Sequence, residues 1–478
     1  MKIDKILNTA TNEEMLIASS DQPSTQQIST AHTSYSNPHR NNMTKYLLYM
    51  VQQHLNFRRA ELESLADLHN ININLDSYDE TSPFLILDLE NDKQAQTLVK
   101  RSILCKAIYE YWGEGIDYKS LHENIVKEIG YEDRKESNKL KSFKFDFETF
   151  GGNHKKSMKE KIDTINQFSY FGFEGEINLK DPNEIYTIIE SYDLISSNES
   201  SKIPHHIFFG RLVGKSDRSA MDVYDLKKRP YKGTTSFESE LSLVSCNIAQ
   251  VKPGTIMYDP FAGTGSFLVA GGYYGALVMG SDIDGRMIRG KGASVNITEN
   301  FKYYNTQEQF LDVMTMDFTH NSLRSNLGID TILCDPPYGI RESIKVLGAR
   351  DPLRFEGKEN LIIDGEKAFL RKDYIPTKKP YSLDSLLDDI LKFASERLPI
   401  GGRLAFWMPT ANDENVETII PLHENLELKY DCVQEFNKWS RRLLVYINRG
   451  ESFNGPENHG AKRSTSNFRD RYFTNFNK

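Results

Sequence analysis

One stretch decides how this chain folds: Thr331-Ile332-Leu333-Cys334, followed directly by Asp335-Pro336-Pro337-Tyr338. Four apolar or β-branched residues predict a buried strand. Two successive prolines end that strand, because each one fixes φ and removes a backbone donor. A stiff loop at the carboxyl end of a strand is where open α/β sheets place their chemistry. The stretch therefore predicts an α/β sheet with a functional loop at residues 335–338.

The chemistry of this loop suits a flat base that carries an exocyclic amine. The ring of Tyr338 would stack on the base, while the Asp335 carboxylate and the Pro336 carbonyl would accept the two amine hydrogens. An ordinary Asp-Pro turn with a surface tyrosine explains the same four residues equally well when they are taken alone. Residues elsewhere in the chain must decide between these interpretations.

A glycine-rich turn, Asp259-Pro260-Phe261-Ala262-Gly263-Thr264-Gly265-Ser266, lies upstream between a short apolar run and the helix-like residues 267–270. Glycines between a strand and a helix let a nucleotide-like ligand approach the backbone closely. The third glycine of the dinucleotide fingerprint is absent, so the turn alone is a weak signal. Asp282 ends the next predicted strand, 23 positions after Asp259. That is close to the roughly 20-residue offset at which an acid reaches a ribose hydroxyl.

A third acid, Asp317, follows the strand-like residues 310–314 and precedes Phe318, so this pair could meet an adenine amine and face. Taken in order, these motifs resemble an S-adenosylmethionine-dependent methyltransferase that acts on an exocyclic amino group. No metal is expected, because the thioether that leaves is neutral. The expected cofactor-binding residues are Asp259, Phe261, Gly263, Gly265, Asp282 and Asp317, and the expected catalytic residues are Asp335, Pro336, Pro337 and Tyr338.

Length and composition predict a globular protein of two or three domains. The chain has 478 residues, of which 38% are hydrophobic and 26% charged. No apolar run approaches the roughly 18 residues of a membrane span. Four scattered cysteines without a Cys-x-x-Cys pair argue against a zinc site or a disulfide framework, and they favour a reducing compartment. The net charge of −8 means that any nucleic-acid binding must come from local patches.

The chain divides into five predicted parts. Residues 1–42 are polar and aperiodic, which predicts a disordered extension. Their one arginine and four acids argue against a mitochondrial presequence. Alternating signals predict an α+β module over 43–125, with strands at 45–51 and 84–89 and helices at 59–69 and 92–105. The remaining parts are a second module over 126–215, the catalytic domain over 216–450 and a polar tail over 451–478.

Within these last parts the elements are predicted from pattern. The second module has strands at 143–150, 176–179 and 205–210 and helices at 155–168 and 183–190, the latter after Pro182. In the catalytic domain, hydroxyl and acidic residues over 234–240 form a helix-capping pattern. An amphipathic helix covers 384–398, and strands cover 403–409 and 443–447. Residues 341–380 have little apolar periodicity and are predicted to be an insertion over the site.

Basic residues gather at two places. Lys155 and Lys156 begin a basic helix, although a charge run is usually only a solvated face. Residues 202–232 hold eight basic residues against three acids. Within them, the cations of Lys227-Lys228-Arg229-Pro230-Tyr231-Lys232 accompany an aromatic ring, a pairing typical of phosphate-lined surfaces. The expected RNA-binding residues are therefore Lys155, Lys156, Lys227, Lys228, Arg229 and Lys232.

From about Met43 onward the chain resembles the catalytic subunits of eukaryotic tRNA guanosine-10 N2-methyltransferases. The likeness is carried by residues 45–50, 227–233, 259–266, 280–286 and 334–339. It implies an N-terminal ferredoxin-like domain, a THUMP domain that grips the tRNA acceptor end and a Rossmann-type class I methyltransferase domain. It also implies S-adenosylmethionine as cofactor, tRNA as substrate, a cytoplasmic location and a small zinc-binding activator subunit as partner. Residues 1–42 depart from the family pattern.

Two other functions remain open at this point. Adenine-N6 methyltransferases of DNA or RNA share the Asp-Pro-Pro-Tyr loop, although the basic stretch and the extra modules suit a folded RNA better. A non-catalytic RNA-binding subunit would need a broken cofactor site, whereas Asp259, Gly263, Gly265 and Asp335 are all present. The sequence does not decide whether one or two methyl groups are added.

Overall fold

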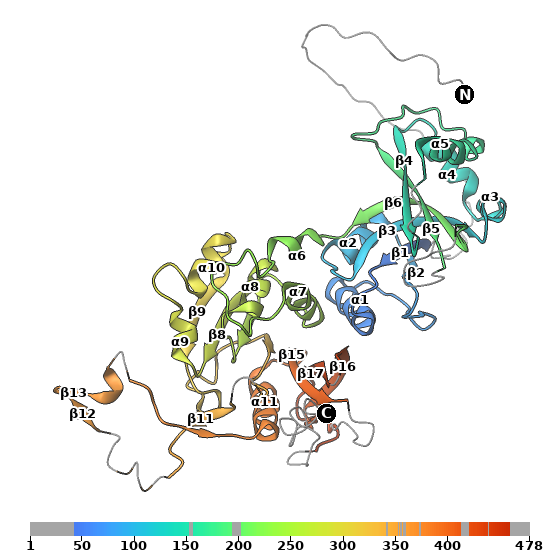
Figure 1. Cartoon of the computed structure of the whole chain (residues 1–478). Coiled ribbons are helices and arrows are strands. Elements are labelled where there is room, and N and C mark those ends of the chain that lie inside the picture. The colour runs from blue at the N-terminus through green and yellow to red at the C-terminus, as the bar shows by residue number, and fades with distance from the viewer. Residues whose placement is uncertain are drawn as a thin grey trace, which may run out of the picture. The chain divides into compact units, whose positions relative to one another are not determined.

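The structure is a computed structural model that describes residues 43–152, 156–193, 202–340, 343–351, 353, 356, 360–371, 374–412, 420–437 and 439–458 (Figure 1). The predicted extension over 1–42 lies outside these residues, as do Lys155 and the part of the predicted tail beyond residue 458. The start of that tail is tied down, because Asn458 accepts a hydrogen bond from the Leu422 amide and donates one to the Ile420 carbonyl.

Residues 44–215 form a six-stranded sheet in the order β2-β1-β3-β6-β5-β4. Only β4 and β5 are parallel, and the other pairs are antiparallel. The strands are β1 (Thr44–Met50), β2 (Phe84–Leu89), β3 (Cys105–Gly115), β4 (Phe143–Phe150), β5 (Glu184–Ser191) and β6 (His206–Lys215).

Helices pack on this sheet over two apolar clusters, and a third cluster, around Tyr49 and Tyr109, lies on strands β1, β3, β5 and β6. Around β1 and β2, helices α1 (Leu55–His69) and α2 (Asp92–Lys100) bury leucines such as Leu62 and Leu98. Around β6, α3 (Tyr118–Lys127) packs on the fully buried Trp112, and α4 (Tyr131–Asn138) and α5 (Met158–Asn166) follow. One sheet therefore joins both predicted modules, and the predicted boundary near residue 125 falls in the last turn of α3.

Three predictions in this region differ from the structure in type or extent. The segment predicted as a helix over 183–190 is the strand β5, which is buried from Tyr186 to Ser191. A segment that is buried on both faces lacks the apolar–polar alternation of a half-buried strand. In addition, a proline such as Pro182 is common at the start of a helix. The helix predicted over 92–105 ends at Lys100, and β3 begins at Cys105. The strand predicted over 176–179 is reduced to a single bridge between Ile177 and Phe143.

The catalytic sheet has seven strands in the order β16-β17-β15-β10-β7-β8-β9. The strands from β15 to β9 are parallel, and β17 runs antiparallel to both β15 and β16. The strands are β7 (Ile256–Asp259), β8 (Leu277–Asp282), β9 (Phe310–Thr315), β10 (Thr331–Cys334), β15 (Arg403–Ala411), β16 (Leu426–Glu435) and β17 (Trp439–Asn448). This topology confirms the predicted Rossmann-type α/β fold.

Helices cover the catalytic sheet on both faces. One apolar core contains α7 (Ser239–Ile248), α8 (Ser266–Tyr273) and α10 (Ile297–Tyr303), and the other contains α11 (Leu383–Arg397). Helix α7 begins later than the capping pattern predicted, and its N-cap residue Glu238 makes no side-chain capping bond. The hydroxyl of Ser236 instead shares a 2.7 Å hydrogen bond with that of Thr264 in the glycine-rich turn.

A buried carboxylate, Glu61 on α1, links the two sheets. Its oxygens accept hydrogen bonds from the Ser102 hydroxyl, from the Ile103 and Leu104 amides, and from Nδ2 of Asn247 on α7, all at 2.7–2.9 Å. An unpaired buried carboxylate would be costly, so four donors make this contact specific. The position of α7, which packs against α8 of the glycine-rich turn, therefore depends on the N-terminal sheet.

Candidate active site

The carboxyl ends of four adjacent parallel strands bring the four predicted acids to one edge of the sheet. Asp335 follows β10, Asp259 ends β7, Asp282 ends β8, and Asp317 comes two residues after β9. The strands are neighbours in that order, which the sequence alone could not establish. The predicted loops therefore belong to one site at the place where open α/β sheets bind their ligands.

The glycine-rich turn has the backbone conformation that the sequence predicts. Gly263 and Gly265 have φ values of 52° and 81°, which favour glycine, and Gly265 is the N-cap of α8. A Cβ atom added to Gly263 would meet only the Phe261 carbonyl oxygen, at 3.9 Å, so this backbone is open to a ligand. A Cβ atom on Gly280 would lie 2.9 Å from Ala262, so the turn sits directly against β8. These features fit a nucleoside cofactor.

Asp259 supports the turn from inside the protein. It is 1% exposed, and its carboxylate accepts a 2.9 Å hydrogen bond from the Phe261 amide. Burial raises the pKa of Asp259 well above its usual value, and the charges of Asp282 and Asp335 act in the same direction. Because its carboxylate is buried, Asp259 can contribute to cofactor binding only through the shape of the turn.

Asp282 also bonds to the backbone. One oxygen accepts from the Gly263 amide at 3.0 Å, and the other from the Asp284 amide at 2.8 Å. The carboxylate therefore joins the glycine-rich turn to the loop that precedes α9 (Gly285–Arg289). A carboxylate oxygen accepts more than one hydrogen bond, so Asp282 can bond to the turn and to a ribose hydroxyl at the same time.

Asp317 is 4% exposed and lies in a dense network. One oxygen accepts from both the amide and the hydroxyl of Thr319, and the other bonds to His320 Nδ1 and accepts from the Leu347 amide at 2.7 Å. Leu347 belongs to β11 (Lys345–Leu347), in the predicted insertion. The Phe261 and Phe318 rings, whose centroids are 5.3 Å apart, add an apolar wall beside this acid.

The catalytic loop is held by its own side chains. The Tyr338 hydroxyl donates a hydrogen bond to Oδ1 of Asp335. Burial raises the pKa of Tyr338 well above its usual value; the negative charge of Asp335 adds to this shift, and the positive charge of Arg441 opposes it. Pro336 is buried, which fixes the path of the loop.

Sequence reasoning missed an aromatic pair beside this loop. The Trp439 ring lies edge-on to Tyr338, with centroids 6.5 Å apart and planes at 69°. Phe436 stacks on Trp439 at 4.7 Å and is 37% exposed. Aromatic residues at the start of a strand usually belong to a core, so only the sheet topology, which places β17 next to β15, reveals this wall.

The predicted RNA-binding residues separate into two groups. Lys227, Lys228 and Lys232 are exposed. Arg229 is 3% exposed, and its Nη1 donates to the Ser266 hydroxyl at 2.9 Å, so its burial argues against the predicted contact with RNA phosphates. Burial lowers the pKa of Arg229. Lys156 forms a 3.1 Å ion pair with the buried Glu190, which leaves its side chain 18% exposed.

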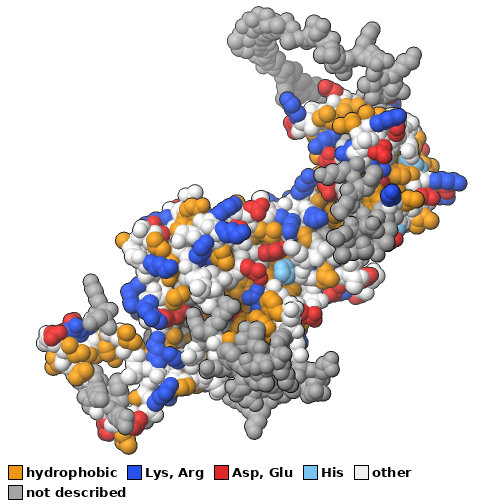
Figure 2. Space-filling view, in the orientation of Figure 1, with side chains coloured by type: hydrophobic (Ala, Val, Ile, Leu, Met, Phe, Trp, Pro, Cys, Tyr) orange, Lys and Arg blue, Asp and Glu red, His pale blue; other side chains and the backbone are white. Residues whose placement is uncertain are grey.

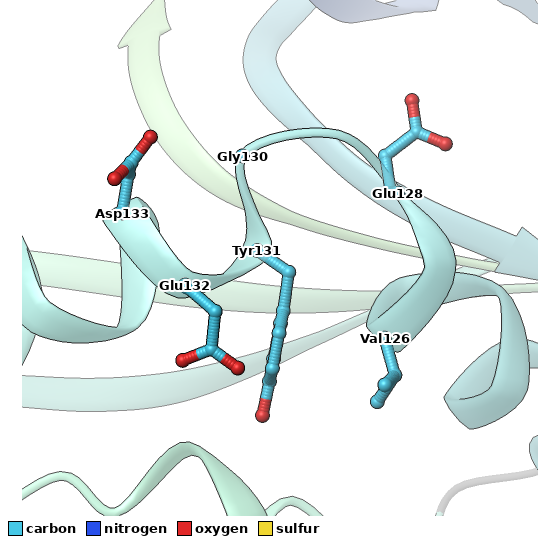
Figure 3. A pocket seen from close by; sticks show the side chains of 6 residues that line it. All are labelled: Val126, Glu128, Gly130, Tyr131, Glu132 and Asp133. Atoms are coloured by element: carbon cyan, nitrogen blue, oxygen red, sulfur yellow. The ribbon is translucent and has the colours of Figure 1, made fainter.

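A pocket of about 290 Å³ lies outside this site, between the end of α3 and the first turn of α4 (Figure 3). Three acids contribute to its lining, which comprises Val126, Glu128, Gly130, Tyr131, Glu132 and Asp133. An acidic lining does not suit a polyanion. Among the described residues, no helix is long and apolar enough to cross a membrane.

Comparison with known proteins gives matches along most of the chain. Residues 44–218 match the family described as the Tmrp11 THUMP N-terminal domain, and residues 227–346 match the RMKL-like methyltransferase domain. A Saccharomyces cerevisiae protein, tRNA (guanine(10)-N(2))-methyltransferase, is 70% identical over 436 residues, which cover 91% of this chain and 100% of the relative.

More distant matches also cover most of the chain. The Homo sapiens protein tRNA (guanine(10)-N(2))-methyltransferase TRMT11 is 32% identical over 460 residues, which cover 91% of this chain and 96% of that protein. The crystal structure of TrmN from Thermus thermophilus matches at 15% identity and a TM-score of 0.38, covering 84% of this chain and 99% of that one.

Proposed function

The chain belongs to the family of tRNA (guanine(10)-N(2))-methyltransferases, and we propose that it transfers one or two methyl groups to the exocyclic N2 of guanosine 10 in tRNA. One observation carries this proposal: a relative with that name is 70% identical over 436 residues, which are the whole of the relative and 91% of this chain. The site supports it, because the glycine-rich turn, the strand-end acids and the Asp-Pro-Pro-Tyr loop lie at one edge of the catalytic sheet.

S-adenosylmethionine is the methyl donor, and when bound it supplies an electrophilic methyl group on a positively charged sulfur. The residues that would hold it are Gly263 and Gly265 through their backbone, Asp282 through its carboxylate, and the Phe261 and Phe318 rings. Asp317 would contribute through its position beside the apolar wall that these two rings form. Open backbone beside acids at adjacent strand ends fits an adenosine-containing group.

The guanine amine is a poor nucleophile, because its lone pair is delocalised into the ring. The Asp335 carboxylate and the Pro336 carbonyl would accept its two hydrogens, which favours a pyramidal nitrogen and directs the lone pair away from the ring. As positive charge develops on the nitrogen, the hydrogen bond to Asp335 becomes stronger, and only such differential interactions raise kcat. The rest of the rate enhancement would come from holding the amine nitrogen and the methyl group in the right orientation.

Extrusion of the guanosine from the tRNA stack costs a few kcal/mol. The rings of Tyr338, Trp439 and Phe436 form an aromatic wall that can offset this cost by stacking. The exposed Lys227, Lys228 and Lys232 would contact phosphates close to the glycine-rich turn, because the neighbouring Gly233 lies beside it: a Cβ atom added there would be 3.2 Å from Thr264.

The finer organisation follows from the resemblance. We propose a ferredoxin-like domain over 43–125, a THUMP-like RNA-binding domain over 126–215 and the methyltransferase domain over 216–450, in a cytoplasmic protein that works with a small zinc-binding activator subunit. Affinity purification of the full chain from its native cell, followed by mass spectrometry and metal analysis, tests the partner. Recovery without a zinc-containing subunit at equal stoichiometry would contradict the proposed heterodimer.

The function itself is tested by incubating the purified protein with an unmodified tRNA transcript and labelled S-adenosylmethionine, followed by nucleoside mass spectrometry. The expected product is N2-methylguanosine or its dimethylated form, which also settles the number of methyl groups. A transcript with adenosine at position 10 is the matched control and should remain unmodified. Label in N6-methyladenosine would instead support the alternative adenine chemistry.

A further inference from the structure

In three segments that are far apart in the sequence, all the charged residues are basic. They are residues 285–294, which include α9, residues 343–350, which include β11, and residues 374–380, which include β14 (Lys378–Pro380). In a chain of net charge −8, these segments hold seven basic residues and no acid. The seven are Arg286, Arg289, Lys291, Lys345, Arg350, Lys378 and Lys379. We refer to this set as the cationic surface.

The structure brings the three segments together. Strands β11 and β14 pair as an antiparallel ribbon in which Leu347 lies opposite Lys378. Nζ of Lys378 donates to the Ile283 carbonyl at 2.8 Å, two residues before α9. Side chains of Lys and Arg gather over the region of α9 and β11 (Figure 2). The ribbon and α9 therefore form one continuous part of the molecule.

This surface adjoins the catalytic edge of the sheet. The ribbon contacts Asp317 through the Leu347 amide, and α9 follows directly on Asp282 and Asp284. Most of its cations point to solvent: Arg286, Arg289, Lys291, Lys345, Arg350 and Lys379 are exposed. Of these, Arg286 is paired with Asp284, at 2.6 Å. The ribbon thus bonds to the site region through Leu347 and Lys378, and it carries two exposed lysines, Lys345 and Lys379, which the register places on opposite faces.

A solvated charged face is the common explanation of a run of lysines. Here the charges come from three separate segments, and because like charges held close together repel one another, binding of a polyanion to them would be favourable. A single phosphate would need only one or two of them. A polynucleotide backbone, which presents phosphates at regular intervals, matches cations distributed over α9 and both strands of a ribbon.

We propose that the cationic surface binds phosphates of the tRNA strand that flanks the nucleoside entering the Asp335 loop. This inference rests on the proposed function and adds to it a second RNA contact, separate from Lys227, Lys228 and Lys232. Its role is to hold the strand on the ribbon side of the site while the base is out of the stack.

The test is a triple variant, Arg289→Ala, Lys345→Ala and Lys379→Ala, made in the full chain. All three side chains are exposed, one on each segment. The matched control is Lys252→Ala, Lys392→Ala and Lys429→Ala, which removes three exposed cations from other elements. Unmodified tRNA transcript is the probe, and its Kd is measured from low to high salt, together with Kd for S-adenosylmethionine and the melting temperature.

For the triple variant we expect the slope of log K for tRNA against log salt concentration to be shallower by about 2, since each lost phosphate contact removes roughly 0.7–0.9. The tRNA Kd at low salt should rise at least about tenfold, while the cofactor Kd and the melting temperature stay those of the control. A slope equal to that of the control overturns the proposal. A changed cofactor Kd with an unchanged slope also overturns it, because the cations would then serve the acids of the site.

This measurement is independent of the methylated position. If the wild-type protein fails to methylate guanosine 10 but its tRNA affinity depends on these three cations, the proposed function fails and the cationic surface stands. If methylation proceeds and the slope is unchanged, the reverse holds. Should the triple variant unfold, the single variant Lys345→Glu gives the same comparison, with an expected slope change of about 1 or more.

Discussion

The hydroxyl of Tyr338 donates a hydrogen bond to Oδ1 of Asp335, so the two side chains expected to hold the base also hold each other. This bond fixes the orientation of the carboxylate before any substrate arrives. Burial and the adjacent charge raise the pKa of Tyr338, so the phenol stays protonated and remains a donor throughout the physiological range. The two side chains would have different roles: the Tyr338 ring would stack on the base, and the Asp335 carboxylate would accept a hydrogen bond from its amine.

Replacement of Asp335 should therefore affect chemistry more than binding. We expect Asp335→Ala to lower kcat by about 10²–10³, or roughly 3–4 kcal/mol, by analogy with the loss of one charge-stabilising group. Asp335→Asn should retain more activity, because its amide oxygen still accepts. Single-turnover methylation, with tRNA and cofactor Kd values measured separately and each moving by less than about tenfold, checks both variants. Near-wild-type turnover in the Ala variant would falsify the catalytic role.

Two variants separate the hydroxyl of Tyr338 from its ring. Tyr338→Phe keeps the ring beside Trp439 but removes the donor to Asp335, so we expect kcat to fall by about 10- to 100-fold, near the net worth of one hydrogen bond to a charged group. Tyr338→Ala also removes the stacking surface, worth about 1–3 kcal/mol, and should lower kcat at least about fivefold further. Equal losses in the two variants, measured by single turnover, would mean that the ring contributes nothing.

Gly265 should be intolerant of a side chain. Its φ of 81° is unfavourable for other residues by roughly 1–2 kcal/mol, and a Cβ atom would lie 3.2 Å from Ile297. We expect Gly265→Val to raise the cofactor Kd at least about tenfold in calorimetry, with little change in tRNA affinity. Gly328→Val is the control, because φ there is not positive and a Cβ atom meets nothing within 4 Å. Cofactor affinity like that of the control would show that the site is misplaced.

Arg229 and its lysine neighbours should behave in opposite ways. Arg229→Ala removes a buried side chain bonded to Ser266 and should cost about 2–3 kcal/mol of stability while leaving the salt slope of tRNA binding unchanged. The double variant Lys227→Ala and Lys228→Ala should flatten that slope by about 1–2 without changing the melting temperature. Thermal melting and salt titration of tRNA binding are measured for both variants. A flattened slope of log K against log salt in Arg229→Ala would mean that Arg229 does contact RNA phosphates.

The buried Asp259 predicts a pH dependence of stability. Its pKa in the folded state is raised, so the folded protein binds this proton more tightly than the unfolded chain does. Stability from this group is thus fully present below the unfolded value near 3.9 and is lost as pH rises through the folded pKa. Asp259→Asn should therefore gain melting temperature relative to wild type at pH 8 and lose that advantage near pH 4. A constant difference across this range would contradict the raised pKa.

The sequence predicted the loops of the site well where residues with strong conformational preferences follow the end of a strand. The prolines after Cys334 and the glycines at 263 and 265 dictate their own conformations, so the loops they define were predictable. The roles of Asp259, Asp282 and Asp317 were harder to predict, because their backbone partners Phe261, Gly263 and Leu347 become neighbours only in three dimensions.

Burial was the main property that the sequence did not convey. Arg229 has the same neighbours in sequence as three exposed lysines, yet it lies inside the protein against α8. Strand β5 was mistaken for a helix because Glu184–Ser191 is buried on both faces, so the alternation of a half-buried strand is missing. Trp439 could not be assigned to the site until the strand order placed it beside Tyr338.

The pairing of β3 with β6 has a practical consequence for anyone who shortens this protein. From Ala107 to Gly115, β3 is bonded to a partner that arrives about a hundred residues later. A fragment that stops near residue 125 would leave this long, largely buried strand as a bare edge, and such edges recruit other chains into aggregates. Soluble fragments should therefore end after Lys215, where the last strand of the shared sheet is complete.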